Sequence, residues 1–270
     1  MIPTLPRALV SSYHGYSVRR RSSRTLQSPS RRKRTIWLYL TACRYFVTTS
    51  GVTGLNVAVL TGSTRTSGPP QVLGPRVEQF IVDSLKERDG LSVTTVINPR
   101  DFSLLEKPAF AYTKSHLPDH LKEIGEKLAQ ADAYVCITPE YNHAPSPGLV
   151  NILNHFGSST FSYKPSAIVS YSAGQWGGTR AAIALRPILS ELGCLPVSAI
   201  IHIPKVADVL DENGAIIGGD GKSQEWQGYV NRSFSQLEWW GEAAHIHRQA
   251  KNPFKASPAF RSDPSQRNAP

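Results

Sequence analysis

Acidic residues are missing from the start of this chain. Residues 1–54 contain nine Arg and one Lys but no Asp or Glu, so this segment alone accounts for the formal net charge of +10. The rest of the chain holds 20 basic and 20 acidic side chains. A folded domain that binds DNA or RNA would be expected to carry a basic stripe of its own. We therefore expect no nucleic-acid partner for the folded part of the protein.

Cysteines and long apolar runs are also scarce. The three cysteines, Cys43, Cys136 and Cys194, have neither the spacing of a disulfide framework nor that of a metal site, so we expect reduced thiols in an intracellular compartment and no bound metal. The apolar residues 36–47 are too few to span a bilayer and include Arg44. The sequence therefore predicts no membrane span.

The two ends of the chain differ in composition from its middle. Residues 1–54 are rich in Arg and Ser, which is typical of a mitochondrial transit segment. A nuclear-type basic cluster at residues 31–34 and a plain disordered extension are the other interpretations. We predict a mitochondrial location, with a cytoplasmic location as the alternative. Residues 251–270 are rich in Pro, Ser and charge, and we interpret them as a disordered tail.

Between these ends, strand and helix patterns alternate. Short aliphatic and β-branched runs predict five strands, at residues 55–60, 91–97, 133–138, 166–171 and 197–203. Helical periodicity predicts helices between them, one of which stops at Gly193. It also predicts a long last helix over residues 223–250, with Trp226, Tyr229, Val230, Leu237 and Trp240 on one side. Ser146-Pro147 resembles an N-cap followed by proline at the first helical position. The alternation predicts one α/β domain over residues 55–250, with three layers and a five-stranded parallel sheet of order 2-1-3-4-5.

Three unusual loops follow the first, third and fourth predicted strands. In such sheets, ligands bind beyond the carboxyl ends of the strands. The first loop offers hydroxyl groups and a cation at Ser63, Thr64, Arg65, Thr66 and Ser67, which suits a phosphate at the start of a helix. A polar turn is the simpler alternative. The G-x-G-x-x-G spacing of a dinucleotide fingerprint and the lysine of a nucleoside-triphosphate P-loop are both absent.

The other two loops suit a planar heterocycle. The second, residues 139–142, places an aromatic side chain and polar groups where a ring could lie against the backbone. The third, residues 172–178, contains Gly174, Gly177 and Gly178, which would let the backbone approach a ring closely. Turn geometry alone would also explain these glycines. The three loops together indicate a ligand that combines a phosphate with a ring.

The same segments resemble a known family. Residues 62–65 (GSTR), residues 138–142 (TPEYN) with 147–151 (PGLVN), and residues 172–178 (SAGQWGG) resemble the NADPH-dependent FMN reductases of flavodoxin-like fold, which include quinone and azo-dye reductases. The resemblance covers about residues 55–203, and its most specific part is Pro139 to Asn142.

The resemblance implies a flavodoxin-like sandwich that binds FMN and NADPH. It implies three groups of cofactor-binding residues, which are Ser63, Arg65, Thr66 and Ser67 at the phosphate, Pro139, Glu140, Tyr141 and Asn142 along one side of the ring, and Ser172, Gly174, Gly177 and Gly178 approaching it from the fourth strand. It also implies a homodimer with FMN near the subunit boundary, which would account for the apolar sides of the helix after Ser146. The first loop is lengthened by residues 68–70, so the last phosphate donor stays open between Thr66, Ser67 and an amide near Gly74.

We therefore expect an oxidoreductase that passes a hydride from NADPH through FMN to a quinone, flavin or azo-type acceptor. No side chain is assigned as a catalytic acid or base, because the cofactor carries the chemistry. The alternatives are a flavodoxin-like electron carrier that holds FMN and a cofactor-free scaffold that binds a partner. The sequence does not distinguish NADPH from NADH, or a dimer from a tetramer.

Overall fold

A computed structural model describes residues 54–104, 106–113 and 115–256. The predicted targeting segment lies outside the described residues, except for Gly54, and so do residues 257–270 of the predicted tail. Localisation and the state of both ends therefore stay predictions. Within the tail region, Pro253–Ala256 form a single helical turn, α9.

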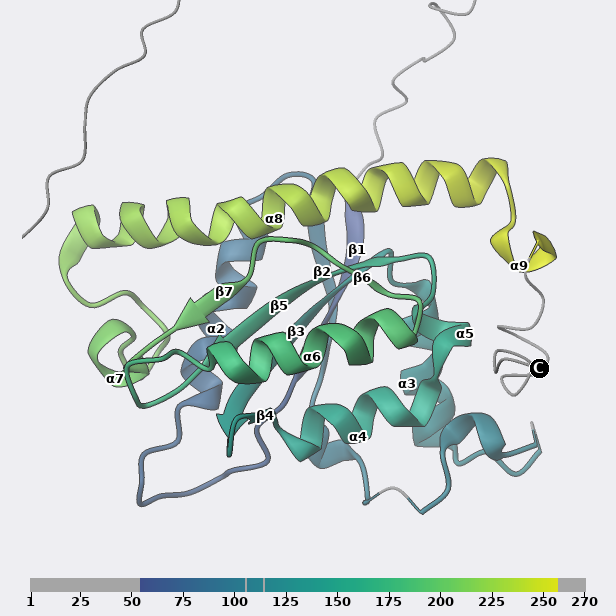
Figure 1. Cartoon of the computed structure of the whole chain (residues 1–270), viewed down its shortest axis with the longest axis horizontal. Helices are drawn as coiled ribbons and strands as arrows, with labels where there is room; N and C mark the ends of the chain where they lie inside the picture. The colour runs from purple at the N-terminus through teal and green to yellow at the C-terminus, as the bar shows by residue number, and fades with distance from the viewer. Residues whose placement is uncertain (1–53, 105, 114, 257–270) are drawn as a thin grey trace, which may run out of the picture. The chain divides into compact units, whose positions relative to one another are not determined.

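A parallel sheet forms the centre of the domain (Figure 1). Its order is β2 (Leu91–Ile97), β1 (Leu55–Thr61), β3 (Ala133–Tyr141), β5 (Pro165–Tyr171), and then β6 (Leu195–Pro196), with β7 (Ile201–Ile203) also paired to β5. This is the predicted order of a flavodoxin-like sheet. The predicted fifth strand, residues 197–203, is corrected to two short strands with residues 197–200 between them, where the Val197 amide still donates to the Ser166 carbonyl at 2.8 Å. A further short strand, β4 (Ala144–Pro145), turns back antiparallel to β3.

Helices cover both faces of the sheet (Figure 1). The side chains of α2 (Gly74–Lys86) and α8 (Gly219–Ala250) share one core cluster with the sheet. Those of α3 (Asp119–Gln130), α4 (Pro147–Phe156) and α6 (Thr179–Glu191) share the other. The shorter helical elements are η1 (Pro99–Asp101), η2 (Ala109–Ala111), α5 (Ser158–Phe161) and α7 (Val206–Val209). The predicted three layers are thus confirmed.

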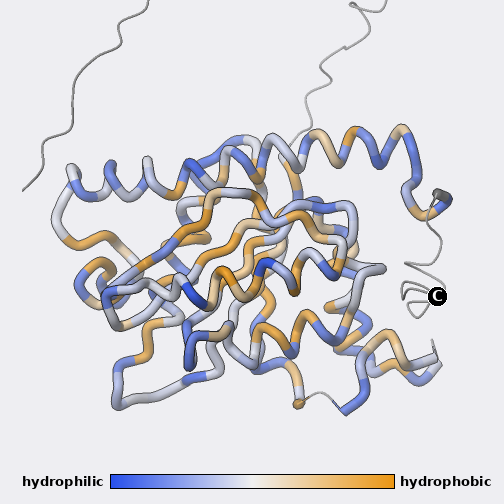
Figure 2. Tube along the Cα trace, in the orientation of Figure 1, coloured by the Kyte–Doolittle hydropathy of each residue, from blue (hydrophilic) through white to orange (hydrophobic). Residues whose placement is uncertain are grey.

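The central strands form the core because both of their faces are covered. All residues of β5 and the first seven of β3 are buried. In β2, at the edge, exposed positions alternate with buried or half-buried ones. Figure 2 shows hydrophobic residues concentrated on these strands. Full burial of one large aliphatic side chain contributes about 1.5–3 kcal/mol. The aliphatic runs that lack alternation therefore mark the middle of a parallel sheet.

Two helix boundaries follow from local chemistry. The Ser146 hydroxyl accepts a hydrogen bond from the Leu149 amide at 3.2 Å, and Pro147 follows at the first helical position, which confirms the predicted N-cap of α4. Helix α6 ends before Gly193, whose φ of 68° is left-handed. Glycine adopts that conformation at little cost, and this confirms the predicted helix stop.

The buried face of α8 differs from the predicted one. Val230 and Leu237 are buried as predicted, and Phe234 is buried with them. Trp240, which the sequence places on the same side, is 43% exposed. The helix also starts earlier than predicted, at Gly219 rather than Ser223.

Among the described residues, no helix has both the length and the apolar character that crossing a membrane requires.

Candidate functional site

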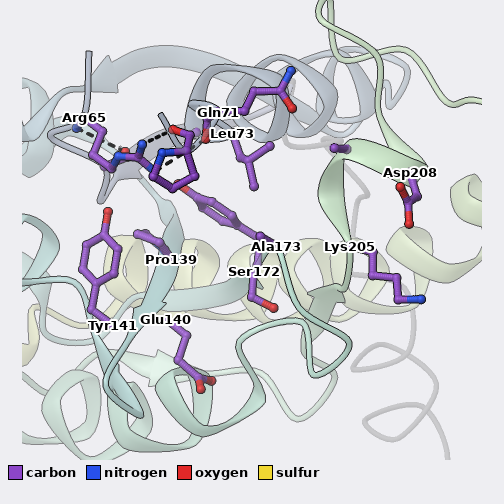
Figure 3. Close-up of a pocket in the computed structure, with 15 residues that line it drawn as sticks. Arg65, Gln71, Leu73, Pro139, Glu140, Tyr141, Ser172, Ala173, Lys205 and Asp208 are labelled. Atoms are coloured by element: carbon purple, nitrogen blue, oxygen red, sulfur yellow. Dashed lines mark hydrogen bonds between the residues drawn. The ribbon is translucent and has the colours of Figure 1, made fainter. Parts of the chain in front are cut away.

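A cavity of about 330 Å³ opens at the carboxyl ends of the parallel strands (Figure 3). We call it the strand-end cavity. Its walls come from the loops after β1, β3, β5 and β7. Its lining residues are Ser63, Arg65, Pro70, Gln71, Leu73, Gly74, Pro139, Glu140, Tyr141, Tyr171, Ser172, Ala173, Lys205, Ala207 and Asp208. The three loops selected from the sequence therefore meet at one place.

Arg65 organises the first loop. Its guanidinium donates to the carbonyl of Pro70 and, at 3.5 Å, to that of Gln71 (Figure 3). It also donates to the carbonyl of Ser67 at 3.5 Å. Its own amide donates to the Ser63 hydroxyl at 3.4 Å. The cation thus holds the lengthened loop together while it lines the cavity. A guanidinium with five N–H donors can do both.

The start of α2 adds positive potential at the same wall. The helix begins at Gly74 without a side-chain cap and has no acidic residue in its first turn. The first N–H groups of a helix lack intrahelical partners, and its dipole is positive at this end. A Cβ at Gly74 would lie 2.8 Å from the Ser63 side chain and 3.0 Å from the Tyr171 hydroxyl. Glycine therefore lets the helix start close against the cavity.

Tyr171, the last residue of β5, borders the cavity with a buried side chain. Burial raises the pKa of its hydroxyl well above the ordinary value, and the hydrogen bond with Ser63 opposes this only in part. The hydroxyl therefore stays protonated at neutral pH. It can donate a hydrogen bond in the cavity without carrying charge.

The second loop is a tight hairpin between β3 and β4. Asn142 and His143 have φ values of 51° and 67°, and Tyr141 pairs with Ala144 across the turn. Two left-handed residues between paired strands match a type I′ turn. The turn places the half-exposed Tyr141 on the cavity and Asn142 at the exposed tip, outside the lining.

The Glu140 side chain contacts the first turn of helix α6. Its carboxylate accepts from the backbone amides of Arg180 and Ala181 at 3.2 and 3.5 Å, and the Arg180 guanidinium pairs with it at 2.5 Å. The Glu140 side chain is only 8% exposed. A carboxylate at the first amides of a helix stabilises the helix terminus. Arg180 also donates to His143 Nε2 at 2.6 Å, which connects the hairpin to the same helix.

The third loop is fixed to the segment that follows β7. The Ser172 amide donates to the carbonyl of Ile203, the Lys205 amide donates to the carbonyl of Gly174, and the Ser172 hydroxyl donates to the carbonyl of Gly174 at 2.9 Å. A Cβ at Gly174 would meet no atom within 4 Å. The backbone at Gly174 therefore has open space beside it, as close approach by a ring requires.

The other two glycines of this loop contact protein. Gly178 has φ of 75°, and a Cβ there would lie 2.9 Å from the Tyr171 amide nitrogen. Gly177, with φ of 57°, would bring a Cβ 3.0 Å from the Pro204 nitrogen. Turn geometry and close packing against β5 and β7 account for both glycines, so neither needs a ligand to explain it.

The predicted site residues thus fall into two groups. Six line the strand-end cavity, namely Ser63, Arg65, Pro139, Glu140, Tyr141 and Ser172. The other six, Thr66, Ser67, Asn142, Gly174, Gly177 and Gly178, belong to the same loops but are not among the lining residues. Their contact with a cofactor stays a prediction.

Sequence reasoning missed one wall of the cavity. Lys205 and Asp208 lie across it from Arg65 and Tyr141, with Ser172 and Ala173 between them (Figure 3). Both follow β7, so the rule that selected the other loops would have found them had the loop after the fifth strand been included. Tyr171 was counted as a strand residue, and no sequence signal shows that its ring faces the cavity.

The comparisons with known proteins agree with this site. The family model described as NADPH-dependent FMN reductase matches residues 55–208. An NAD(P)H-dependent FMN reductase of Pseudomonas aeruginosa is 29% identical over 46% of this chain and 66% of its own length. A quinone reductase of Pseudomonas putida is 30% identical over 37% of this chain. The match spans only 56% of that relative's length, so these relatives are matched over about two thirds of their length or less.

Solved structures share the fold. The flavoenzyme NAD(P)H:(acceptor) oxidoreductase FerB of Paracoccus denitrificans superposes with a TM-score of 0.52 over 68% of this chain and 97% of its own, at 20% identity. That likeness concerns the fold alone. The family model, in contrast, covers more than half of the chain and every residue that lines the strand-end cavity. The chain therefore belongs to the family of NADPH-dependent FMN reductases.

Proposed function

We propose that this protein binds FMN in the strand-end cavity and acts as an NAD(P)H-dependent oxidoreductase that reduces a quinone, flavin or azo-type acceptor. The observation that carries the proposal is the convergence of the loops after β1, β3 and β5 on one cavity. Family membership supports the cofactor, and the curated relatives named above support the class of acceptor. A cavity of about 330 Å³ is also within the usual range for small-molecule sites.

The residues on the α2 side of the cavity fit the phosphate of FMN. The uncapped start of α2, the Ser63 hydroxyl and the Arg65 guanidinium offer neutral and charged donors at one wall. Arg100, beside Asn98 after β2, lines a smaller cavity that borders the same loop and adds a second cation. Dianionic phosphate is stabilised by this combination of helix terminus and guanidinium.

The opposite part of the cavity fits the flavin ring. Tyr141 offers an aromatic face, and the open backbone at Gly174 lets a flat molecule approach. Lys205 and Asp208 at the far wall are placed to contact the edge of a ring or of a second substrate. The residues present therefore fit FMN at both of its ends.

Bound FMN would supply the redox chemistry, accepting a hydride from NADPH and passing two electrons to the acceptor. The chain itself would bind and orient the reactants. Tyr171, held protonated by burial, would donate a hydrogen bond rather than exchange a proton. Tyr141, which lines the cavity, and the exposed Trp176, which follows Ser172 and Ala173 in the same loop, would give a planar acceptor aromatic surfaces on which to stack.

We also propose a homodimer, because the resemblance of the site loops to the family implies one. A partner subunit would also have accounted for the apolar sides of α4. In the structure α4 is covered within its own chain, because Phe102, next to η1, packs against its residues His155 and Phe156. Helix α4 therefore does not require a second subunit, and light scattering of the purified protein would decide the oligomeric state.

Two measurements on the purified full chain test the proposed activity. Absorbance after FMN is added and excess is removed should show a bound flavin, and NADPH oxidation should speed up when a quinone is supplied. Flavin binding without NADPH oxidation would instead indicate an electron carrier. A protein that gains no flavin would be a cofactor-free scaffold, and either result would contradict the proposed enzyme. Repeating the assay with NADH compares the two donors.

A further inference from the structure

A second cavity lies at the opposite end of the sheet, where the strands begin. It measures about 410 Å³ and lies between the start of β5 and β6 and the C-terminal part of α8. We call it the strand-start cavity. Its lining residues are Tyr163, Lys164, Pro165, Gly193, Leu195, Trp240, Ala243, Ala244, His247, Arg248, Lys251 and Pro253. None of them belongs to the strand-end cavity, so the proposed FMN site leaves this cavity unexplained.

The body of the strand-start cavity is apolar. Leu195 and Trp240 are 48% and 43% exposed, although both are large hydrophobic side chains. Pro165, Ala243, Ala244 and Pro253 complete the apolar wall. Ligand sites in proteins typically combine such a wall with a few polar groups that set orientation. Because these side chains surround a cavity rather than form a flat face, they suit the hydrocarbon part of a single molecule.

Basic side chains line this cavity. Lys164, His247, Arg248 and Lys251 line it, and no acidic side chain does. Among the described residues, neither His247 nor Lys251 takes part in an ion pair. Arg248 pairs with Asp132 at 2.8 Å and donates to the Tyr163 carbonyl at 2.8 Å, which leaves further guanidinium N–H groups available.

The Lys164 ammonium, which lies behind the cavity wall, forms no ion pair with a carboxylate among the described residues. The buried Lys164 ammonium is held by neutral oxygens only, the carbonyls of Leu128 and Ala129 and the Tyr134 hydroxyl, at 2.8–3.3 Å. The nearby carboxylate, Asp132, is already shared by Arg248 and by His245 at 2.7 Å. Burial accordingly lowers the pKa of Lys164 from 10.5 to about 8, and the charge of Arg248 adds to this. An anion in the cavity would compensate this excess.

We propose that the strand-start cavity binds an amphipathic anion, a hydrocarbon chain that ends in a carboxylate. The hydrocarbon lies against Trp240, Leu195 and the alanines of α8. The carboxylate lies at the rim, where Arg248 and Lys251 supply charged donors and the His247 ring adds a further nitrogen. A charged hydrogen bond is stronger than a neutral one, so the carboxylate sets both the affinity and the orientation.

Calorimetric titration of the full chain with decanoate, below its micelle concentration, tests this proposal. We expect one site, with 1-decanol binding at least about tenfold more weakly because it lacks the charge. The titration is repeated with and without FMN, and the affinity should not change. Competition with FMN, equal affinity for decanol, or no binding would overturn the proposal. Binding to anionic vesicles without binding of monomeric decanoate would overturn it in favour of a lipid-surface contact.

Two sets of variants locate the site. His247→Gln with Lys251→Gln removes two basic groups at the rim, both on exposed residues, and should weaken decanoate binding about tenfold. Lys255→Gln, outside the cavity on α9, should leave the affinity unchanged. Ala244→Trp fills the cavity and should abolish binding while NADPH oxidation is unaffected. Unchanged decanoate affinity in both cavity variants would place the ligand elsewhere and overturn the assignment.

Discussion

The Glu140 carboxylate joins the end of β3 to the start of α6 through Arg180. It accepts the Arg180 backbone amide at 3.2 Å and the guanidinium at 2.5 Å. The family resemblance implies that Glu140 lies along the flavin ring. Its side chain serves the scaffold in addition, because one carboxylate satisfies both a helix terminus and a cation. The loop that borders the strand-end cavity is thereby fixed to the helix behind it.

Glu140→Gln should lower the free energy of unfolding by about 1–3 kcal/mol, since it removes charged hydrogen bonds from a side chain that is only 8% exposed. Urea denaturation followed by circular dichroism measures this. Glu126→Gln, on the exposed side of α3, is the matched control and should change stability by less than about 0.5 kcal/mol. Equal effects of the two substitutions would show that the Glu140 contacts contribute nothing.

Arg65→Ala should weaken FMN binding by about 1.5–3 kcal/mol, which is roughly ten- to hundredfold in Kd. The substitution removes a cation from the cavity wall and three hydrogen bonds that hold the loop. Arg65→Lys keeps the charge but cannot hydrogen-bond to three carbonyls at once. Its affinity for FMN should therefore lie between those of the wild type and Arg65→Ala. Flavin fluorescence titration gives both affinities. An unchanged Kd in Arg65→Ala would argue against a phosphate at this loop.

Gly174→Val should abolish FMN binding and leave the fold intact. A Cβ at this position meets no protein atom within 4 Å, so the added side chain occupies space that the ring would use. Stability should change by less than about 0.5 kcal/mol. Absorbance after FMN addition and thermal unfolding of the apoprotein measure the two effects. A variant that still turns yellow to the normal extent would show that the ring lies away from Gly174.

Gly178→Ala should instead destabilise the fold, because Gly178 has left-handed φ and a Cβ would press against the Tyr171 backbone at 2.9 Å. Gly219→Ala is the control, since Gly219 has a similar φ of 79° but open space around it. Left-handed strain alone costs about 1–2 kcal/mol, and Gly178→Ala should cost more than that. Similar losses in the two variants, measured by urea denaturation, would mean that close packing contributes little.

Lys164 should make stability depend on pH between about 8 and 10.5. Burial lowers its pKa to about 8 in the folded chain, so in this window the unfolded chain holds more protons. The free energy of unfolding therefore rises with pH from this group, by about 3 kcal/mol in total. The measurement is the difference between wild type and Lys164→Met in urea denaturation across the window. Lys122→Met, on an exposed side chain, should give no such trend, and parallel curves for wild type and Lys164→Met would contradict the prediction.

Local sequence patterns determined the order of elements and the place of the site. Uninterrupted aliphatic runs such as residues 55–60 predict strands covered on both faces, and alternation with helices predicts a parallel sheet. The carboxyl ends of parallel strands share one edge, so loops that begin at Gly62, Pro139 and Ser172 could be expected to meet. Ser146 and Gly193 also marked helix boundaries correctly, because capping depends on residues close in sequence.

Only the tertiary structure decided which partner each side chain takes. The Glu140 carboxylate forms an ion pair with Arg180 of α6. Trp240 is 43% exposed and does not pack in the core. Tyr171, Lys205 and Asp208 complete the lining of the strand-end cavity. The short 3₁₀ turns cover α4, where the sequence had suggested a second subunit. These outcomes depend on contacts between residues far apart in the chain and on how the elements pack. Periodicity and local propensity record which face of an element is apolar, but they do not record what that face will touch.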